Sequence, residues 1–198
     1  MPKTGLTSDQ IKERAIACTI ERMRKFGYEK VRLSDIARDL GVSHAALYSH
    51  FTDKAALFDA VTERWLLDVD GKLAAHCDPS KDPLACITEW CVELHKAKCE
   101  KVRFDPELYR AFNFSAQMEK PFVQNHINTM KTQLLELVER AIAKNMMKGD
   151  AGDAKRIVAL ILDATMSFHH PVLVVDRINE SREDDLRNLL KTLFAGLK

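Results

Sequence analysis

The sequence predicts an all-α protein, and three observations support this class. The strict alternation of apolar and polar residues that marks a half-buried strand is not sustained anywhere in the 198 residues. Apolar residues instead recur at every third and fourth position, as they do along one face of a helix. Most of the 7 Gly and 6 Pro residues fall between these periodic segments, where helices begin and end.

Cap and turn residues divide the chain into about nine helices. Thr7 and Gln10 have the spacing of a capping box at the start of the first helix, and Gly27 can end it. Asp82 and Asp105 each precede a proline, an arrangement typical of a helix N-terminus. The predicted helices span residues 8–26, 34–40, 44–51, 53–76, 83–101, 106–116, 120–147, 153–179 and 182–196, and we expect the eighth to bend at Pro171.

The composition excludes several other classes of protein. Hydrophobic residues make up 46% of the chain, which is too much for a disordered protein. No run of about 18 apolar residues predicts a membrane span, and the first ten residues lack the apolar core of a secretory signal. The five cysteines include no CxxC pair, which argues against a zinc finger or a disulfide framework. We therefore expect a cytoplasmic protein with reduced thiols and no membrane partner.

Residues 34–51, SDIARDLGVSHAALYSHF, have the pattern of a helix-turn-helix. Gly41 supplies the positive φ that ends a helix abruptly, and Ser43 can cap the next one. Leu47 and Phe51 lie four residues apart and face inward together, which leaves small side chains on the outer face. Such a face can enter a major groove about 12 Å wide. An ordinary helical hairpin is the alternative, but the outer face lacks the usual Glu and Lys.

The charge of the first 54 residues suits a DNA backbone. They hold ten Lys or Arg against seven Asp or Glu, whereas the whole chain carries a formal net charge of +1. Lys54 begins the fourth predicted helix, where free backbone N–H groups favour a phosphate, and Tyr48 can donate its phenolic hydrogen to one. The outer face of residues 44–50 has no Arg, Asn or Gln, so we expect DNA shape to contribute to specificity.

Several short motifs within residues 8–60 occur together in one known family. They are Phe26-Gly27-Tyr28, Asp35-Ile36-Ala37, Leu40-Gly41-Val42-Ser43, Leu47-Tyr48, Phe51 and Lys54. In these motifs the segment resembles the DNA-binding domain of the tetracycline-repressor (TetR) family. The resemblance implies a homodimeric repressor with a DNA-binding domain at residues 1–52, built as a three-helix bundle, and an effector-binding and dimerisation domain at residues 53–198.

The resemblance also assigns roles to individual residues. It places Tyr48, His50 and Lys54 on phosphates of double-stranded operator DNA. The whole expected DNA-binding set is Arg32, Ser34, Ser43, His44, Ala45, Ala46, Tyr48, Ser49, His50 and Lys54. For Arg32, which precedes the second helix, a solvated basic loop is an equal alternative. The chain departs from the family pattern at Val31-Arg32, where relatives have Thr or Ser, so Ser34 is expected to cap the second helix. It also has His44-Ala45 where Lys and Gly are common, which affects the operator sequence.

The last two long helices are apolar around much of their girth and are expected to be buried. The resemblance implies that they form a four-helix dimer interface, with packing inside one chain as the alternative. The residues expected at this interface are Ile157, Ile161, Leu186, Leu190, Leu193 and Phe194.

Aromatic and methionine side chains of the larger domain are candidates to line a cavity for a small apolar effector. Each of them can also belong to a plain core, and His169, which precedes His170 and Pro171, can be a satisfied core histidine. The expected ligand-binding set is Trp90, Phe112, Phe114, Met118, Phe122, Met130, Met166 and His169.

Cys91, His95 and Cys99 recur every four residues and drift by about 40° per step around the helix. Thiolates with imidazole suit zinc, copper(I) or a thiol sensor, and the pair His169-His170 raises the same question. Three ligands on one straight helix cannot surround a metal without help from elsewhere.

No catalytic motif accompanies these features. The patterns GxGxxG, GxSxG, HExxH and the P-loop are absent, and no cofactor is expected. The predicted function is therefore a DNA-binding transcriptional regulator, a repressor that a small apolar ligand releases from its operator. A metal- or thiol-responsive regulator is the alternative, and a small helical enzyme with a convergent polar pocket is the alternative from a different class.

Overall fold

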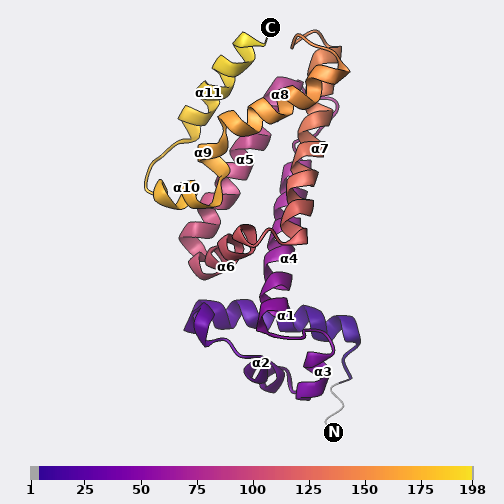
Figure 1. Ribbon diagram of the computed structural model, residues 1–198, viewed down its shortest axis with the longest axis vertical. Coiled ribbons are helices and arrows are strands. Elements are labelled where there is room, and N and C mark those ends of the chain that lie inside the picture. Colours follow the sequence, from indigo (N-terminus) through magenta and orange to yellow (C-terminus); the bar gives the residue numbers. More distant parts are fainter. Residues whose placement is uncertain (1–4, 198) are drawn as a thin grey trace. The chain divides into compact units, whose positions relative to one another are not determined.

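The computed structural model describes residues 5–197, which form helices joined by short loops and turns, without strands (Figure 1). None of the helices in this part of the chain has the length and apolar character needed to cross a membrane. The elements are α1 (Ser8–Phe26), the 3-10 helix η1 (Tyr28–Lys30), α2 (Leu33–Leu40), α3 (His44–Tyr48), α4 (Lys54–Ala74), α5 (Pro83–Phe104), α6 (Pro106–Gln117), α7 (Pro121–Ala143), α8 (Ala151–Ala164), α9 (Met166–His169), α10 (Pro171–Asp176) and α11 (Glu183–Gly196).

The chain divides into two compact units. The N-terminal unit comprises Met1–Trp65 and Asp105–Glu119, and the C-terminal unit comprises Leu66–Phe104 and Lys120–Lys198. The division falls inside α4, so one continuous helix belongs to both units. It also adds α6 to the N-terminal unit, although the sequence pattern groups this helix with the larger domain.

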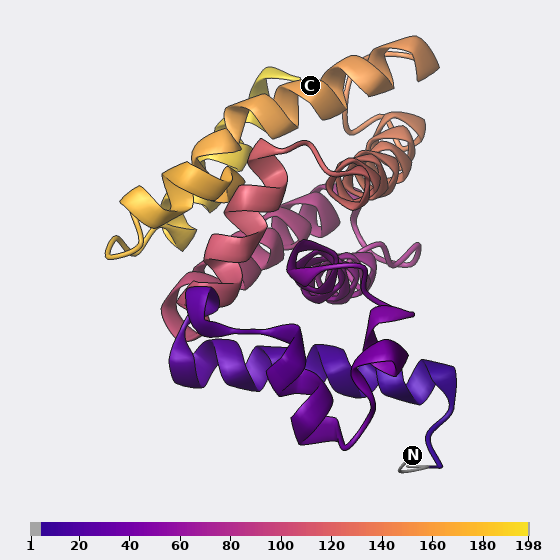
Figure 2. The ribbon, with the colours of Figure 1, turned by 60° about the horizontal axis from the view of Figure 1, so that its bottom comes forward.

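The helices α1, α2, α3 and the start of α4 lie together in the N-terminal unit (Figure 2), and with Leu108 and Ala111 of α6 they enclose one apolar core. The predicted capping box is confirmed, because Thr7 and Gln10 each accept a hydrogen bond from the other's backbone N–H. Gly27 follows α1 with a φ of 84° and Gly41 follows α2 with a φ of 65°, so both glycines end helices as predicted. The buried apolar side chains include Ala15, Ile16, Met23, Ile36, Leu47, Phe51 and Leu57.

Helix α6 belongs to this unit because polar and aromatic contacts fix it there. Asp105 accepts two hydrogen bonds from the Arg24 guanidinium, one of them 2.7 Å long, and therefore makes no capping bond to its own helix. Asp105 thus occupies the predicted N-cap position before Pro106 but does not use its side chain as a cap, whereas the Asp82 carboxylate accepts from the Ala85 N–H and caps α5. The Trp65 ring packs edge-on against Phe112 of α6, with ring centroids 5.0 Å apart.

In the C-terminal unit α7 packs against α5 and α8, and α11 packs against α5 and α8. The single bent helix expected at 153–179 is three helices. The first break follows Ala164, where the Thr165 hydroxyl donates to the Ile161 carbonyl at 2.7 Å, a bond that competes with the helical ladder. The second lies at His170, which is extended (φ −63°, ψ 131°) as expected before Pro171.

Replacing Leu47 by Ala tests whether this side chain holds the helix-turn-helix together. Leu47 has 0% of its surface exposed, so Leu47→Ala should lower the free energy of unfolding by about 2 to 5 kcal/mol. Urea denaturation measures the change. Ser49→Ala, on the exposed side of the same turn, is the matched control and should change stability by less than about 0.5 kcal/mol. Equal losses for the two variants would contradict this packing.

Candidate functional site

The turn between α2 and α3 has the geometry of a helix-turn-helix. The backbone N–H of Val42 donates to the Ala37 carbonyl at 3.0 Å, which closes the corner. Ser43 caps α3 as predicted, because its hydroxyl accepts from the Ala46 N–H at 3.1 Å. Leu47 points into the core, which turns the opposite face of this short helix outward.

The outward face of α3 collects most of the residues expected to contact DNA. Ser43, His44, Ala45, Tyr48 and Ser49 are exposed, and Ala46 and His50 are half-buried beside them. The His44 and Tyr48 rings lie 4.7 Å apart, so the two aromatic side chains form one edge of the face. Helix α3 is shorter than predicted and ends at Tyr48, and the Ser49 hydroxyl donates to the Ala46 carbonyl at 2.8 Å.

Lys54 lies at the N-terminus of α4 and is held by groups that sequence reasoning missed. Its ammonium donates to the Glu29 carbonyl at 2.9 Å and lies 5.3 Å from the Tyr28 ring centroid and 5.2 Å from that of Phe58. An ammonium has three hydrogens, so this bond leaves two for a phosphate oxygen. Asp53 caps α4 by accepting a hydrogen bond from the Ala56 N–H. The sequence signal for such a cap is an acidic residue three positions before the N–H that it accepts from.

The start of α2 differs from the expectation. Its N-cap position is Arg32, which makes no capping bond, and Ser34 lies inside the helix and is exposed. The expectation that Ser34 caps this helix is therefore wrong. Ion pairs secure α2 instead: Arg22 of α1 lies 2.6 Å from Asp39 and 3.4 Å from Asp35. The Arg22 guanidinium holds the pKa of the Asp39 carboxyl below its ordinary value.

The expected ligand-binding residues are divided between the two units. Three of them, Phe112, Phe114 and Met118, lie in the N-terminal unit, where Phe112 is packed against Trp65 while the other two are 54% and 59% exposed. The C-terminal unit holds Trp90, Phe122, Met130, Met166 and His169. Trp90 and Met130 are buried, Phe122 and His169 are half-buried, and Met166 is exposed. Neither unit by itself gathers the whole set.

A buried group of polar side chains in the C-terminal unit escaped the sequence reasoning. Nδ1 of His126 in α7 lies 2.6 Å from the Asp70 carboxylate of α4. Because a carboxylate can only accept, Nδ1 carries the hydrogen and donates it. Gln133 donates to the Asp70 carbonyl at 3.1 Å and accepts from the Trp90 indole at 2.8 Å. Lys98 of α5 is 3% exposed. A lysine inside the apolar stripe of α5 is the sequence signal of a buried charge, but it does not indicate the partners on α4 and α7.

Burial controls the protonation of these groups. It lowers the pKa of Lys98 to about 7, although the Asp70 carboxylate acts in the opposite direction. It also lowers the pKa of His126, and that of His169 to about 4. His169 bonds through Nε2 to the Leu162 carbonyl at 3.1 Å, which makes it a satisfied histidine. His170 points its Nδ1 to the Val172 N–H instead.

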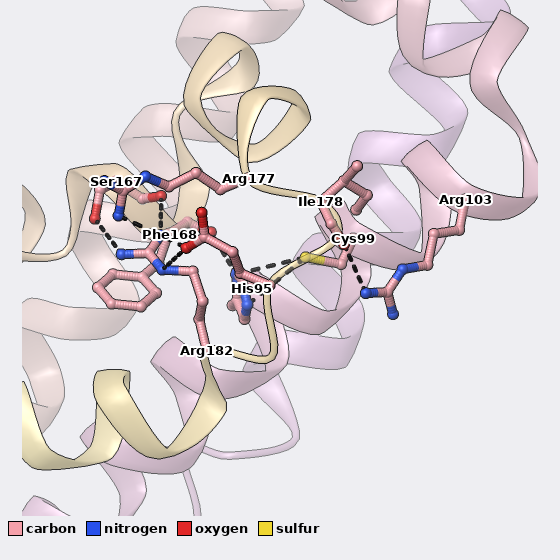
Figure 3. A network of polar contacts seen from close by, with 9 residues as sticks. His95, Cys99, Arg103, Ser167, Phe168, Arg177, Ile178 and Arg182 are labelled. Carbon is pink, nitrogen blue, oxygen red and sulfur yellow. Dashed lines mark hydrogen bonds and ion pairs between the residues drawn. The ribbon is translucent and has the colours of Figure 1, made fainter.

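The Cys91, His95 and Cys99 series does not assemble as a metal site. Among residues 5–197 no group of three or more His, Cys, Asp or Glu side chains is placed to hold a metal ion. Cys91 is buried, which raises the pKa of its thiol to about 12. His95 bonds through Nδ1 to the Phe168 carbonyl at 2.8 Å, and Cys99 lies 3.6 Å from His95 Nε2 (Figure 3). The thiol interpretation is thus reduced to Cys99.

Cys99 faces a hollow of about 500 Å³ between α5 and the start of α11, with Arg103 and Arg182 also in its lining. Arg182 is buried and donates to the Ser167 carbonyl at 2.9 Å, while its guanidinium lies 4.0 Å from the Phe168 ring centroid (Figure 3). It therefore serves to fasten the segment before α11 to α9.

The residues expected at a dimer interface already pack within one chain. Five of the six, namely Ile157, Ile161, Leu186, Leu190 and Phe194, are at most 6% exposed, and Leu193 is half-buried. These five side chains therefore follow the alternative given above, which is packing inside one chain. Helix α8 packs against α7 and helix α11 packs against α5, and both bury these side chains. On the outer side Leu160 and Met166 are each 42% exposed.

The thiols should differ in their reactivity. Because the thiolate is the reactive form, a pKa of about 12 leaves Cys91 almost wholly protonated at pH 8. We expect iodoacetamide to label the half-buried Cys18, Cys77 and Cys99 well before Cys91, as followed by peptide mass spectrometry. In urea all five should label at similar rates. Labelling of native Cys91 as fast as Cys18 would contradict the buried site.

Comparisons with known proteins agree with this geometry. A model of the tetracyclin repressor-like C-terminal domain matches residues 83–190, and a model of bacterial regulatory proteins of the tetR family matches residues 16–61. An uncharacterized HTH-type transcriptional regulator of Mycobacterium tuberculosis is 21% identical over 177 residues, which are 88% of this chain and 86% of that protein.

Solved structures share the fold. A transcriptional regulator of the TetR/AcrR family from Thermobifida fusca superposes with a TM-score of 0.69 at 18% identity and covers 94% of this chain and 98% of the other. The SmeT–triclosan complex superposes with a TM-score of 0.60 at 16% identity and covers 95% of this chain and 92% of the other. At such identities the likeness establishes the fold and nothing further.

Proposed function

Because the chain belongs to the tetracycline-repressor (TetR) family of DNA-binding transcriptional regulators, which are not enzymes, we propose that it is a repressor released from its operator by a small apolar effector. The observation that carries the proposal is the exposed face of α3. This face points outward because Leu47, on the opposite side of the helix, is fully buried. The protein would act in the cytoplasm, where it meets double-stranded DNA.

The proposed DNA contacts divide by role. Tyr48, His50 and Lys54 would bind phosphates, with Arg32 adding a backbone contact from the exposed start of α2. Ala45 and Ala46 would contact thymine methyl groups, while His44 and Ser49 would hydrogen-bond to base edges. Because few side chains on this face can form paired bonds to one base, the sequence-dependent shape of the operator would supply part of the specificity.

The effector would bind in the C-terminal unit and act on the DNA-binding unit through α4. Triclosan, which occupies SmeT, is a small apolar molecule, and this supports an apolar effector here. Helix α4 starts at Lys54 and continues past Trp65 into the C-terminal unit. Helix α6 offers a second route, since it follows α5 directly and is bonded to Arg24 of α1. Coupling of this kind is reciprocal, so DNA would weaken effector binding by the same factor.

We also propose that two copies assemble through the outer sides of α8 and α11. Leu160 and Met166 are exposed there, and Leu189 and Leu193 are half-buried. A second copy would cover these apolar side chains, and its two-fold symmetry would require a pseudo-palindromic operator.

Lys54→Met tests the phosphate contact. Methionine retains the apolar contact with Tyr28 and Phe58 but removes the charge. Binding to a duplex selected on the wild-type protein from a random-sequence pool should weaken by about 1 to 2 kcal/mol. Binding to unrelated sequences should weaken similarly, and the dependence of log Kd on log salt should fall by about one phosphate. Fluorescence anisotropy measures both quantities.

The matched control is Lys72→Met, on the exposed side of the same helix, which should leave affinity and salt dependence unchanged. Wild-type behaviour of Lys54→Met would remove Lys54 from the DNA contacts. Failure of the wild-type protein to select any duplex would contradict the proposed function itself.

A pair of substitutions tests the dimer. Leu160→Glu places a charge on an exposed position, so the chain should stay folded but sediment as a monomer at micromolar concentration. Leu190→Glu places a charge at a fully buried position and should lower the free energy of unfolding by roughly 3 kcal/mol or more. Thermal unfolding followed by circular dichroism measures this loss. A monomeric wild type, or a dimeric Leu160→Glu, would contradict the proposed interface.

A further inference from the structure

The buried polar group formed by Asp70, Lys98 and His126 is costly unless it has a use. Its side chains come from three different helices, α4, α5 and α7, and those of Lys98 and His126 are each 3% exposed. Buried polar atoms without partners are rare in folded proteins, because each one loses its bond to water. A group of this kind in a domain without catalytic function indicates that part of it awaits a ligand.

The unused bonding capacity lies on His126. Its Nε2 is buried and has no hydrogen-bond partner among the described residues. The Asp70 carboxylate accepts from Nδ1, which fixes the ring so that Nε2 faces away from Asp70. In the neutral ring Nε2 is an acceptor, and in the charged ring it is a donor. The neutral ring can therefore accept a hydrogen bond from a protonated carboxylic acid, whereas only the charged ring can donate one to a carboxylate.

The basic side chains of the group favour an anion, because they can take up protons when one binds. Three basic side chains act on one another here: burial has the largest effect on the pKa of His126 and of His169, and the charge of Lys98 lowers both further. The Asp70 carboxylate is already bonded to His126. A bound carboxylate would supply negative charge close to these bases and reverse the effect of burial on Lys98. A neutral alcohol would satisfy Nε2 but would leave the charged form of Lys98 disfavoured, and an amine would add a like charge.

We propose that the effector is an apolar carboxylic acid whose carboxylate is bound by Lys98 and by Nε2 of His126. This inference rests on the proposed function, because it names the chemical class of the effector. Trp90 gives a direct reporter: its indole donates to Gln133 at 2.8 Å, and Gln133 donates to the backbone of Asp70 at 3.1 Å. A ligand that disturbs Asp70 or His126 should therefore change the emission of Trp90.

The experiment compares three probes of equal chain length on the full-length protein: octanoate, 1-octanol and octylamine. The chain has two tryptophans, so a Trp65→Phe background leaves Trp90 as the single reporter. Octanoate should bind at least about tenfold more tightly than 1-octanol, since a bond between charged partners is the stronger one. Octylamine should bind most weakly. Equal affinities, or a preference for octanol or octylamine, would overturn the proposal without any variant of the group.

Proton uptake provides a second measurement. At pH 8 Lys98 is largely neutral, because burial lowers its pKa to about 7, and a bound carboxylate should restore its charge. Calorimetric titration of octanoate in buffers of different ionisation enthalpy should then show uptake of about two protons per ligand, one on Lys98 and one on His126, whose Nε2 must carry a hydrogen to donate to the carboxylate. Uptake of one proton or none at pH 8 would contradict the role of Lys98.

Two variants separate the roles of the side chains. Lys98→Met removes the charge and keeps the length of the chain. His126→Asn keeps a donor for Asp70, close to the position of Nδ1, but removes Nε2. Each should lower the affinity for octanoate about tenfold or more. Lys98→Met should change the affinity for 1-octanol by less than about twofold, whereas His126→Asn should weaken it, because the alcohol bonds to Nε2. Lys72→Met is the surface control, and thermal unfolding verifies that the variants are folded. Folded variants with wild-type affinity for octanoate would overturn the assignment.

Binding to the selected duplex distinguishes this inference from the function on which it rests. If octanoate binds through Lys98 but no duplex is ever selected, the proposed function fails and the binding site stands. If a duplex is selected but octanoate does not bind, this inference fails and the proposed function stands. Release of the duplex by octanoate from the wild type, but not from Lys98→Met, supports both.

Discussion

The burial of Leu47 beneath α3 is the contact on which the DNA-facing surface depends. Helix α3 has five residues, too few to be stable without tertiary contacts, so its position is set by the side chain that it buries and by its cap at Ser43. With Leu47 fully inside the core, helical geometry places His44, Ala45 and Tyr48 outside. The chemistry available to DNA thus follows from one apolar contact on the opposite side of the helix.

The two units use polar groups in different ways. In the N-terminal unit ion pairs hold helices together: Arg22 binds Asp39 between α1 and α2, and Arg24 binds Asp105 between α1 and α6. In the C-terminal unit Asp70 is paired with His126, yet Nε2 of that ring has no partner. An ion pair between two helices gives rigidity, whereas a buried ring nitrogen without a partner leaves free energy available for a ligand.

Helix α6 illustrates how side-chain contacts override sequence order. By position it follows α5, whose residues belong to the C-terminal unit, and nothing in its apolar spacing separates it from that neighbour. Arg24 lies 81 residues before its partner Asp105, and Trp65 lies 44 residues before its partner Tyr109. Because ion pairs and aromatic contacts over such separations leave no local pattern, they become visible only in the folded structure.

The sequence by itself determined the features that depend on neighbouring residues. The capping box at Thr7, the glycine ends of α1 and α2, the cap at Ser43 and the helix-turn-helix all follow from local geometry, and the motifs of this segment were sufficient to identify the family. The direction in which apolar faces point depended on tertiary structure: Ile161 and Leu190 are apolar enough for a dimer interface but pack within one chain. The group of Asp70, Lys98 and His126 also depended on tertiary structure, because residues from three helices meet there only after folding. Local propensity specifies where a helix begins and ends, whereas the burial of one face or one charge is decided by the surfaces that come to cover it.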